Sequence, residues 1–241
     1  MRPFLFAYLL LIAPHFLSAQ KLWIEPSVGF FLTGASSGFY KLEDVVVVPL
    51  GPDRSDNLIF GLTIGMPLTP KLSWRNSFNY FSTSQTVLVY NAVEVCTFCP
   101  LKMYRSLVKR VIGITPALSY SLIKRDRFSI SALAGVETQF QSSNSNQQDY
   151  NWGTKRPGVQ EVLNNLNSSV KPVVFYYQFG GIVSYGRFSF SVSRTNLLSK
   201  SYTSSIPFQG NKYPFYNKDA FLRFILSYRI EFKRHEKKDL E

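Results

Sequence analysis

The chain has 241 residues and carries 27 basic against 15 acidic side chains, a formal net charge of +12 at pH 7. It contains 21 Phe and 14 Tyr, yet its mean hydropathy is −0.03, a balance that argues against a bundle of membrane helices. Its basic residues are spread over turns, loops and the tail 233–241 instead of forming one patch, which argues against nucleic acid as a partner.

The N-terminal residues have the pattern of a secretory signal peptide. Met1-Arg2-Pro3 is followed by a short apolar run to Leu17 and then by the small residues of Ser18-Ala19-Gln20. A basic start, an apolar core and a small-residue cleavage point are the three parts of such a signal. We therefore expect residues 1–20 to be removed on export, with a retained anchor helix as the alternative.

After residue 20, apolar and polar residues alternate in eight segments. Alternation with a period of two is typical of a strand with one apolar and one polar face, and each segment is long enough to cross a membrane as a tilted strand. The predicted strands are, in chain order, 22–33, 57–66, 72–83, 107–122, 128–141, 171–185, 187–197 and 220–232. Pro26 and Pro116 each remove a ladder donor, so a bulge or a strand end is expected at both.

The connections between these segments alternate between short and long. Short periplasmic turns and long external loops are typical of outer-membrane barrels, and with eight strands both termini then lie in the periplasm. One short helix is expected at Gly158 to Leu166, inside the third long connection. The short connections are 67–71, 123–127 and Gly186 with its neighbours, and the long ones are 34–56, 84–106, 142–170 and 198–219.

The orientation of the two faces separates a membrane barrel from a secreted, lipocalin-like carrier with an apolar interior. The polar faces are rich in Gly and Ser, which suit the crowded interior of a narrow barrel. Aromatic residues recur on the apolar faces near strand ends, as in an interfacial girdle: Trp74, Tyr120, Phe128, Tyr185, Phe188, Tyr228 and Phe232. We predict an all-β protein, an eight-stranded antiparallel up-and-down transmembrane β-barrel over residues 21–232.

A few charged residues fall on the inward faces. Glu25, Arg75 and Arg229 lie at similar heights near the turn ends of their strands, and Glu137 and Arg223 share a second height. Buried charges require partners, and the interior of an eight-stranded barrel is just filled by its side chains. We expect these residues to form a charge network that plugs the lumen, with an ion path as the alternative.

Residues that could carry catalysis are scarce. The mature chain keeps one histidine, His235 in the tail, so the strands offer no Ser–His or Asp–His pair. The same scarcity disfavours a metal site. We therefore predict no catalytic site, no metal and no cofactor, and a protein that is not an enzyme.

Two loops contain candidate sites of another kind. Cys96 and Cys99 form a C-x-x-C motif in the second long connection, where export favours a local disulfide; a redox or metal role and free thiols are the alternatives. The fourth long connection places aromatic residues beside lysines, a composition that fits contact with a glycan or protein, or packing over the barrel mouth. Its candidate contact residues are Tyr202, Phe208, Lys212, Tyr213, Phe215 and Tyr216.

The chain resembles the small outer-membrane β-barrel domain proteins common in Bacteroidota and, more broadly, the OmpA/OmpX-type eight-stranded barrels. The resemblance covers 21–232 and rests on Ser18-Ala19-Gln20, the eight alternating segments and a last strand that ends at Phe232; the charged tail 233–241 departs from the usual terminal aromatic residue. It implies residence in the outer membrane, and with it contact with lipid. In some members it implies adhesion or service in secretion machinery. The excess of basic residues over loops and turns suggests lipopolysaccharide as an anionic partner, with plain solvated loops as the alternative.

The predicted function is therefore a non-enzymatic barrel with a plugged lumen, whose external loops bind a surface glycan or protein or give structural support. The main alternative is an accessory subunit of a larger outer-membrane secretion or uptake complex. A narrow channel and a soluble lipocalin-like carrier rank below both.

Overall fold

The computed structural model describes residues 22–33, 40–52, 57–91, 103–146, 157–166, 170–198, 204–215 and 220–232. The expected signal peptide, the charged tail, Cys96 and Cys99 lie outside these ranges. Within them, no helix is long and apolar enough to cross a membrane.

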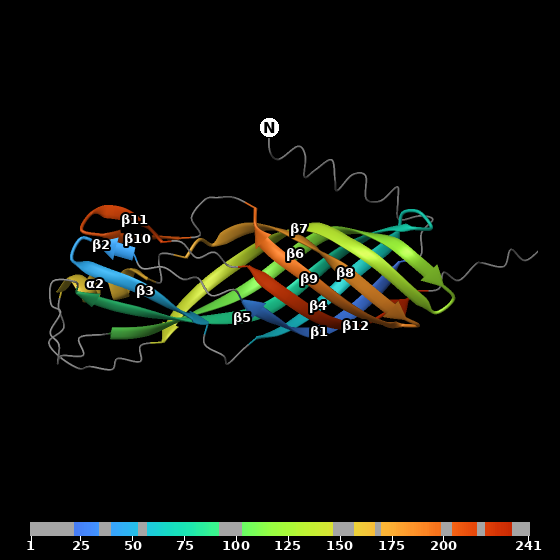
Figure 1. Ribbon diagram of the computed structural model, residues 1–241, viewed down its shortest axis with the longest axis horizontal. Helices are drawn as coiled ribbons and strands as arrows, with labels where there is room; N and C mark the ends of the chain where they lie inside the picture. Colours follow the sequence, from blue (N-terminus) through green and yellow to red (C-terminus); the bar gives the residue numbers. More distant parts are fainter. Residues whose placement is uncertain are drawn as a thin grey trace, which may run out of the picture.

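Eight antiparallel strands close into a barrel (Figure 1), which confirms the predicted fold class. Each strand pairs with the next, and the last pairs with the first to close the ring. The strands are β1 (Trp23–Thr33), β4 (Leu58–Pro67), β5 (Leu72–Asn91), β6 (Met103–Arg125), β7 (Phe128–Asn146), β8 (Val173–Tyr185), β9 (Phe188–Leu197) and β12 (Phe221–Tyr228). The short β13 (Ile230–Glu231) continues the line of β12 and pairs with the start of β1.

The two prolines do not interrupt their strands as predicted. Pro116 pairs with Asn76 of β5 in unbroken register; on its other side the ladder with β7 lacks the rungs at Thr115 and Pro116 but keeps its register, and the shift in β6 lies instead between Ser121 and Ile123. Opposite Pro26, the ladder between β1 and β12 lacks rungs, yet the register is the same on both sides of the gap. Because Pro removes a single donor, the ladder loses local pairing without shifting.

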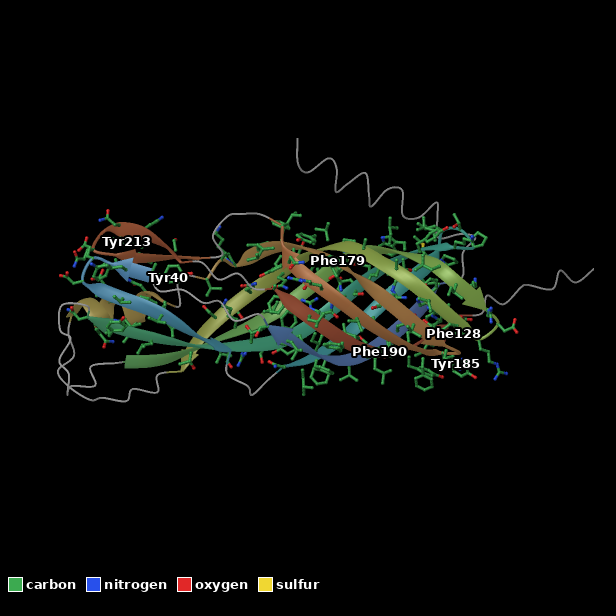
Figure 2. The ribbon with its side chains drawn as sticks, viewed as in Figure 1. Tyr40, Phe128, Phe179, Tyr185, Phe190 and Tyr213 are labelled. Carbon is green, nitrogen blue, oxygen red and sulfur yellow. The ribbon has the colours of Figure 1, made fainter. Side chains whose placement is uncertain are left out.

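The barrel wall is apolar outside and polar inside. Along β8, Val173, Phe175, Tyr177 and Phe179 are exposed, whereas the side chains between them are buried. Figure 2 shows Phe128, Tyr185 and Phe190 on the outer surface of the wall. An apolar belt of this extent is the outer surface of a transmembrane barrel, and it is the reverse of the arrangement in a lipocalin-like carrier.

Three strands run well past the ends predicted for them. β5, β6 and β7 have 20, 23 and 19 residues, whereas β1 has 11. Their excess lengths project from the loop end of the barrel, where β3 (Val45–Pro52) pairs with β5 and β2 (Tyr40–Leu42) pairs with β3 (Figure 1).

The same end of the molecule carries helix α2 (Pro157–Asn165), within one residue of its predicted span, and the hairpin of β10 (Ser204–Phe208) and β11 (Asn211–Phe215). The name "head" is used below for β2, β3, α2, β10, β11 and the tip of β5 from residue 87 to 91. The head therefore combines segments from four regions of the sequence.

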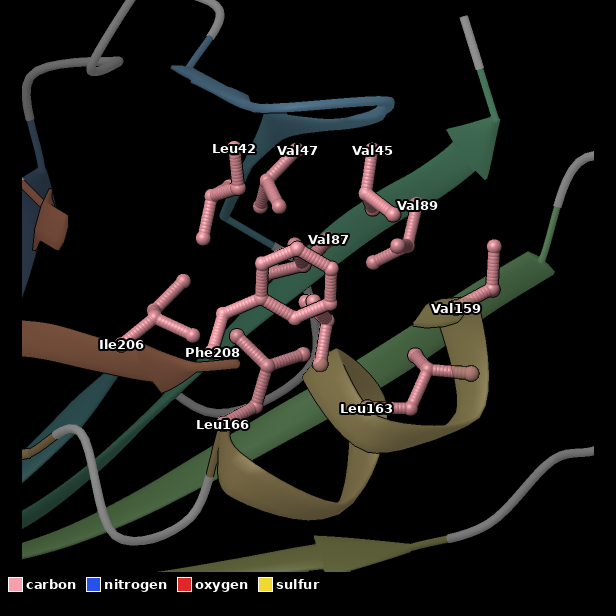
Figure 3. Packing of buried hydrophobic residues seen from close by; sticks show 11 residues of the cluster. Leu42, Val45, Val47, Val87, Val89, Val159, Leu163, Leu166, Ile206 and Phe208 are labelled. Atoms are coloured by element: carbon pink, nitrogen blue, oxygen red, sulfur yellow. The ribbon is translucent and has the colours of Figure 1, made fainter. Parts of the chain in front are cut away.

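The head has its own hydrophobic core (Figure 3). Helix α2 contributes one apolar face, because its buried residues follow the spacing of three and four that is typical of an amphipathic helix. This face packs against the β2–β3 hairpin, the tip of β5 and β10. The core residues are Leu42, Val45, Val47, Val87, Val89, Val159, Val162, Leu163, Leu166, Ile206 and Phe208.

Candidate functional site

At the turn end of the lumen, β1, β5 and the residue between β12 and β13 bring together Glu25, Arg75 and Arg229. Arg75 Nη2 donates a hydrogen bond to Glu25 Oε2, and Arg229 Nε donates to Glu25 Oε1 at 2.8 Å. Glu25 is fully buried, and Arg75 is 8% exposed. One carboxylate thus faces two guanidinium groups, so this turn-end cluster has a formal charge of +1, from two positive charges and one negative.

Nearer the loop end of the barrel, Arg223 of β12 and Glu137 of β7 form a two-point ion pair. Arg223 Nη1 donates to Glu137 Oε2 at 2.6 Å, and Nη2 donates to Oε1 at 2.9 Å. Gln139 Nε2 also donates to Glu137 Oε1, at 2.9 Å. Both ion-pair side chains have no exposed area, and this loop-end pair is electrically balanced.

An aromatic cluster lies against the loop-end pair. The guanidinium carbon of Arg223 lies 5.1 Å from the ring centre of Phe81 and 5.6 Å from that of Phe221. Phe31 and Tyr176 complete the cluster, with ring centres 5.2 to 5.9 Å from their neighbours. The sequence reasoning missed this cluster, although Phe31 already stood on the inward-facing positions of its strand.

Two polar cavities adjoin the turn-end cluster. A small cavity of about 40 Å³ lies deeper in the lumen and is lined in part by Arg75, Asn79 and Gln178. A larger one, of about 260 Å³, lies at the turn end and is lined by Trp23, Arg75 and Arg229 together with residues of the turn between β4 and β5. The larger one is termed the turn-end cavity below. Arg75 lines both cavities and so lies at the boundary between them.

The structure corrects one of the predicted loop contacts. Phe208 is 1% exposed, because it fills the head core between α2 and the β2–β3 hairpin, and it is therefore not available to a partner. Lys212 is exposed. Tyr202 and Tyr216, and the side chain of Phe215, lie outside what the structure describes.

Tyr213 is half-buried on the surface of the head. Its ring packs against Phe208, with 6.3 Å between ring centres, and its hydroxyl donates a hydrogen bond to Glu43 Oε1 at 3.1 Å. Partial burial and this carboxylate neighbour raise the pKa of the Tyr213 hydroxyl above its usual value. The contact fixes the β10–β11 hairpin to the turn between β2 and β3.

Metal-ligating residues do not gather in the described ranges, where no group of three or more His, Cys, Asp or Glu could hold an ion. The chain matches no family model and no curated protein. Among solved structures, LpxR from Salmonella typhimurium aligns with 86% of this chain and 99% of its own, at a TM-score of 0.28 and 11% identity. An alignment at this level transfers no residue role to the present chain.

Our prediction that the protein is not an enzyme does not stand: the aligned structure, LpxR, is an outer-membrane enzyme, a lipid A deacylase, and the similarity is too low to assign any activity to the present chain. The prediction relied on the scarcity of chemistry-bearing residues along the strands. Since a fold does not determine activity, a barrel architecture gives no ground for excluding catalysis.

Proposed function

We propose that the protein is an outer-membrane barrel that holds its folded head outside the cell as a platform for binding a surface glycan. In this orientation the three short turns and both mature termini face the periplasm. The observation that carries the proposal is the head core, which joins three loop regions to the tip of β5 and so gives the external surface a defined shape. A rigid platform binds with a smaller loss of conformational entropy than mobile loops.

The surface chemistry of the head supports a carbohydrate ligand. Tyr40 and Tyr213 are partly buried, pack on the core, and lie in the head as Figure 2 shows. Lys41, Glu43 and Lys212 are exposed around them. Half-buried aromatic rings with charged hydrogen-bonding neighbours offer an apolar face and polar contacts together, which suits the mixed surface of a sugar.

We expect Tyr213→Ala to weaken glycan binding about fivefold to tenfold, because it removes an aromatic contact. Tyr213→Phe keeps the ring and loses only the bond to Glu43, so it is the matched control and should retain most of the affinity. The measurement is binding of the purified barrel in detergent to a glycan array. A wild-type protein that binds no glycan, or equal loss in the two variants, would contradict this function.

The lumen in this proposal is plugged. The turn-end cluster occupies one end of the bore, and the loop-end pair and the aromatic cluster lie together nearer the loop end, where their side chains have at most 3% exposure. An eight-stranded barrel has an interior just wide enough for such side chains. These observations support a closed barrel over a narrow channel.

Contact with lipopolysaccharide is supported by the rim of the apolar belt. Arg110 and Arg194 are exposed on outward-facing positions of β6 and β9, next to the belt on its loop side. Arg194 Nε donates to Asn196 Oδ1 at 3.1 Å, which orients its guanidinium. Arginines at a membrane surface pair well with phosphate groups.

We expect Arg110→Ala and Arg194→Ala each to reduce lipopolysaccharide binding about fivefold, since a surface cation near anionic lipid contributes about 1 kcal/mol. Binding can be measured by titrating lipopolysaccharide into the detergent-solubilised barrel. Arg187→Ala, at the turn end of the wall, is the control and should bind like the wild type. Equal losses in all three variants would show a nonspecific charge effect and refute the rim site.

A further inference from the structure

We propose that the turn-end cavity is a binding site for a small, oxygen-rich anion, a carboxylate or a phosphate. The site is independent of the head, which lies at the other end of the molecule (Figure 1), so its failure would leave the proposed glycan platform standing.

The walls of the cavity consist largely of hydroxyl groups. Six serines from four strands line it: Ser73, Ser119, Ser121, Ser129, Ser131 and Ser184. Each hydroxyl can donate one hydrogen bond, so together they can satisfy several acceptor oxygens of one ligand. A volume of about 260 Å³ is below the usual range for drug-sized ligands, which limits the occupant to a small molecule.

Cations dominate the charge around the cavity. Arg75, Arg229 and Lys124 line it, and Glu231 is the lining carboxylate. Glu25 is buried behind the two arginines, so the group has three positive and two negative charges and a formal charge of +1. A concave site with an excess of one sign of charge concentrates ligands of the opposite sign.

The two arginines keep donors for a ligand. A guanidinium group has five N–H donors, and the described contacts of Arg75 and Arg229 with Glu25 use one nitrogen of each. Arg75 is 8% exposed and borders the deeper cavity, whereas the Arg229 side chain is 27% exposed. Guanidinium groups form paired hydrogen bonds with carboxylates and phosphates, which gives this wall its selectivity for anions.

The contrast with the loop-end pair supports a role beyond structure. There, one guanidinium is matched to one carboxylate by two hydrogen bonds and neither has any exposed area. At the turn end, two guanidinium groups share the single carboxylate of Glu25, both border a cavity, and the cations still exceed the carboxylates by one when Lys124 and Glu231 are counted. A purely structural network would be stable with one arginine, because an unmatched charge in a confined site is unfavourable.

The position of Lys124 completes the site. It lies at the turn end of β6 and lines the cavity, and its Nζ donates to the carbonyl oxygen of Pro70, 3.5 Å away, in the turn between β4 and β5. Lys124 is exposed, whereas Arg75 is buried, so the cavity has one cation at the protein surface and another in its inner wall.

Trp23 provides the reporter for a direct test. The guanidinium carbon of Arg229 lies 4.8 Å from the centre of the Trp23 ring, so a ligand that moves Arg229 changes the environment of the indole. Trp74→Phe and Trp152→Phe leave Trp23 as the single tryptophan. In this background, inorganic phosphate and succinate are titrated separately at constant ionic strength, with glucose as the uncharged control, and Trp23 emission is recorded.

We expect a saturable emission change with phosphate or succinate and none with glucose. Arg229→Gln should weaken binding about tenfold or more, because it removes a charge-assisted contact while Glu25 keeps Arg75 as a partner. Arg187→Gln is the matched control: Arg187 is an exposed turn-end cation that bonds to the Tyr228 hydroxyl at 3.2 Å and does not line the cavity. It should bind like the parent protein.

A second pair of variants keeps the test decisive if Arg229→Gln does not fold. Lys124→Ala removes the exposed cation, and Ser131→Leu fills the cavity without changing its charge. Both should weaken the titration, and folding of each is checked by the mobility shift between unboiled and boiled samples. The proposal is overturned if the parent protein gives no saturable change, if Arg187→Gln weakens binding as much as Lys124→Ala, or if folded Ser131→Leu binds like the parent.

Discussion

Arg223→Ala is expected to destabilise the folded barrel by about 3–5 kcal/mol, the largest effect of any single substitution proposed for the lumen. The substitution leaves the Glu137 carboxylate fully buried with Gln139 as its described hydrogen-bond partner. It also removes the cation that packs on Phe81 and Phe221. An unpaired buried charge carries its full desolvation cost, whereas the intact pair does not.

The double variant Glu137→Leu with Arg223→Met separates charge from packing. Replacing both partners with apolar residues of similar size leaves no orphaned charge, so most of the lost stability should return. The measurement is urea unfolding in lipid vesicles, followed by the gel mobility shift. Arg194→Ala, the same change on the outer surface, is the control and should stay close to the wild type. If Arg223→Ala unfolds at the same urea concentration as Arg194→Ala, the loop-end pair does not stabilise the folded barrel.

The wild type and the double variant also test whether the lumen is closed to ions. The wild type in a planar bilayer should show no steady ion conductance, because the loop-end pair and the aromatic cluster pack against each other and fill the bore. The apolar double variant should remain equally closed, since it keeps the volume of the two side chains. Steady conductance in the wild type would favour the channel alternative.

Phe208→Ala is expected to destabilise the head by about 3–5 kcal/mol while the barrel stays folded. Phe208 is 1% exposed and lies among residues of α2, β3 and β5, so its removal leaves a cavity at the centre of the head core (Figure 3). The barrel strands are joined by their own closed ladder. A loss confined to the head is therefore the expected result.

The effect of Phe208→Ala can be measured by limited proteolysis with trypsin and by hydrogen exchange of the α2 amides. Both should increase, while the mobility shift of the barrel is retained. Lys212→Ala, an exposed change on the same hairpin, is the control and should leave both measurements unchanged. Simultaneous loss of the barrel shift would show that head and barrel unfold as one unit and would contradict the separate core.

Local pattern was sufficient to place the barrel strands and their faces. A wall with lipid on one side and a polar lumen on the other imposes a period of two on the residues themselves, so the alternation along β8 is visible without any partner strand. Counting residues from the turn ends of the strands also placed Glu25 near Arg75 and Arg229, because close to a shared end the shear displaces neighbouring strands by only a few residues. The fold class follows from this pattern and is confirmed.

The head could not be predicted from the alternation of apolar and polar residues. Val87 and Val89 belong to the head core, and Leu88 between them, on the opposite face of β5, is buried as well. A strand buried on both faces loses its alternation. The predicted strand therefore ended at residue 83. The burial of Phe208 depends on contacts with α2 and the β2–β3 hairpin, which come from separate connections.

In the lumen, too, the sequence shows which residues face inward, and the tertiary structure decides which of them meet. Inward-facing positions can be read along each strand, but the level at which they meet depends on the shear of the closed barrel. The contact of Phe31 with Phe81 and Phe221 joins three strands that are far apart in sequence, and the turn-end cavity takes its serines from four. The alternation of residues depends only on one strand and on the lipid and the polar lumen at its two faces. A core or a cavity exists only where several strands meet in space.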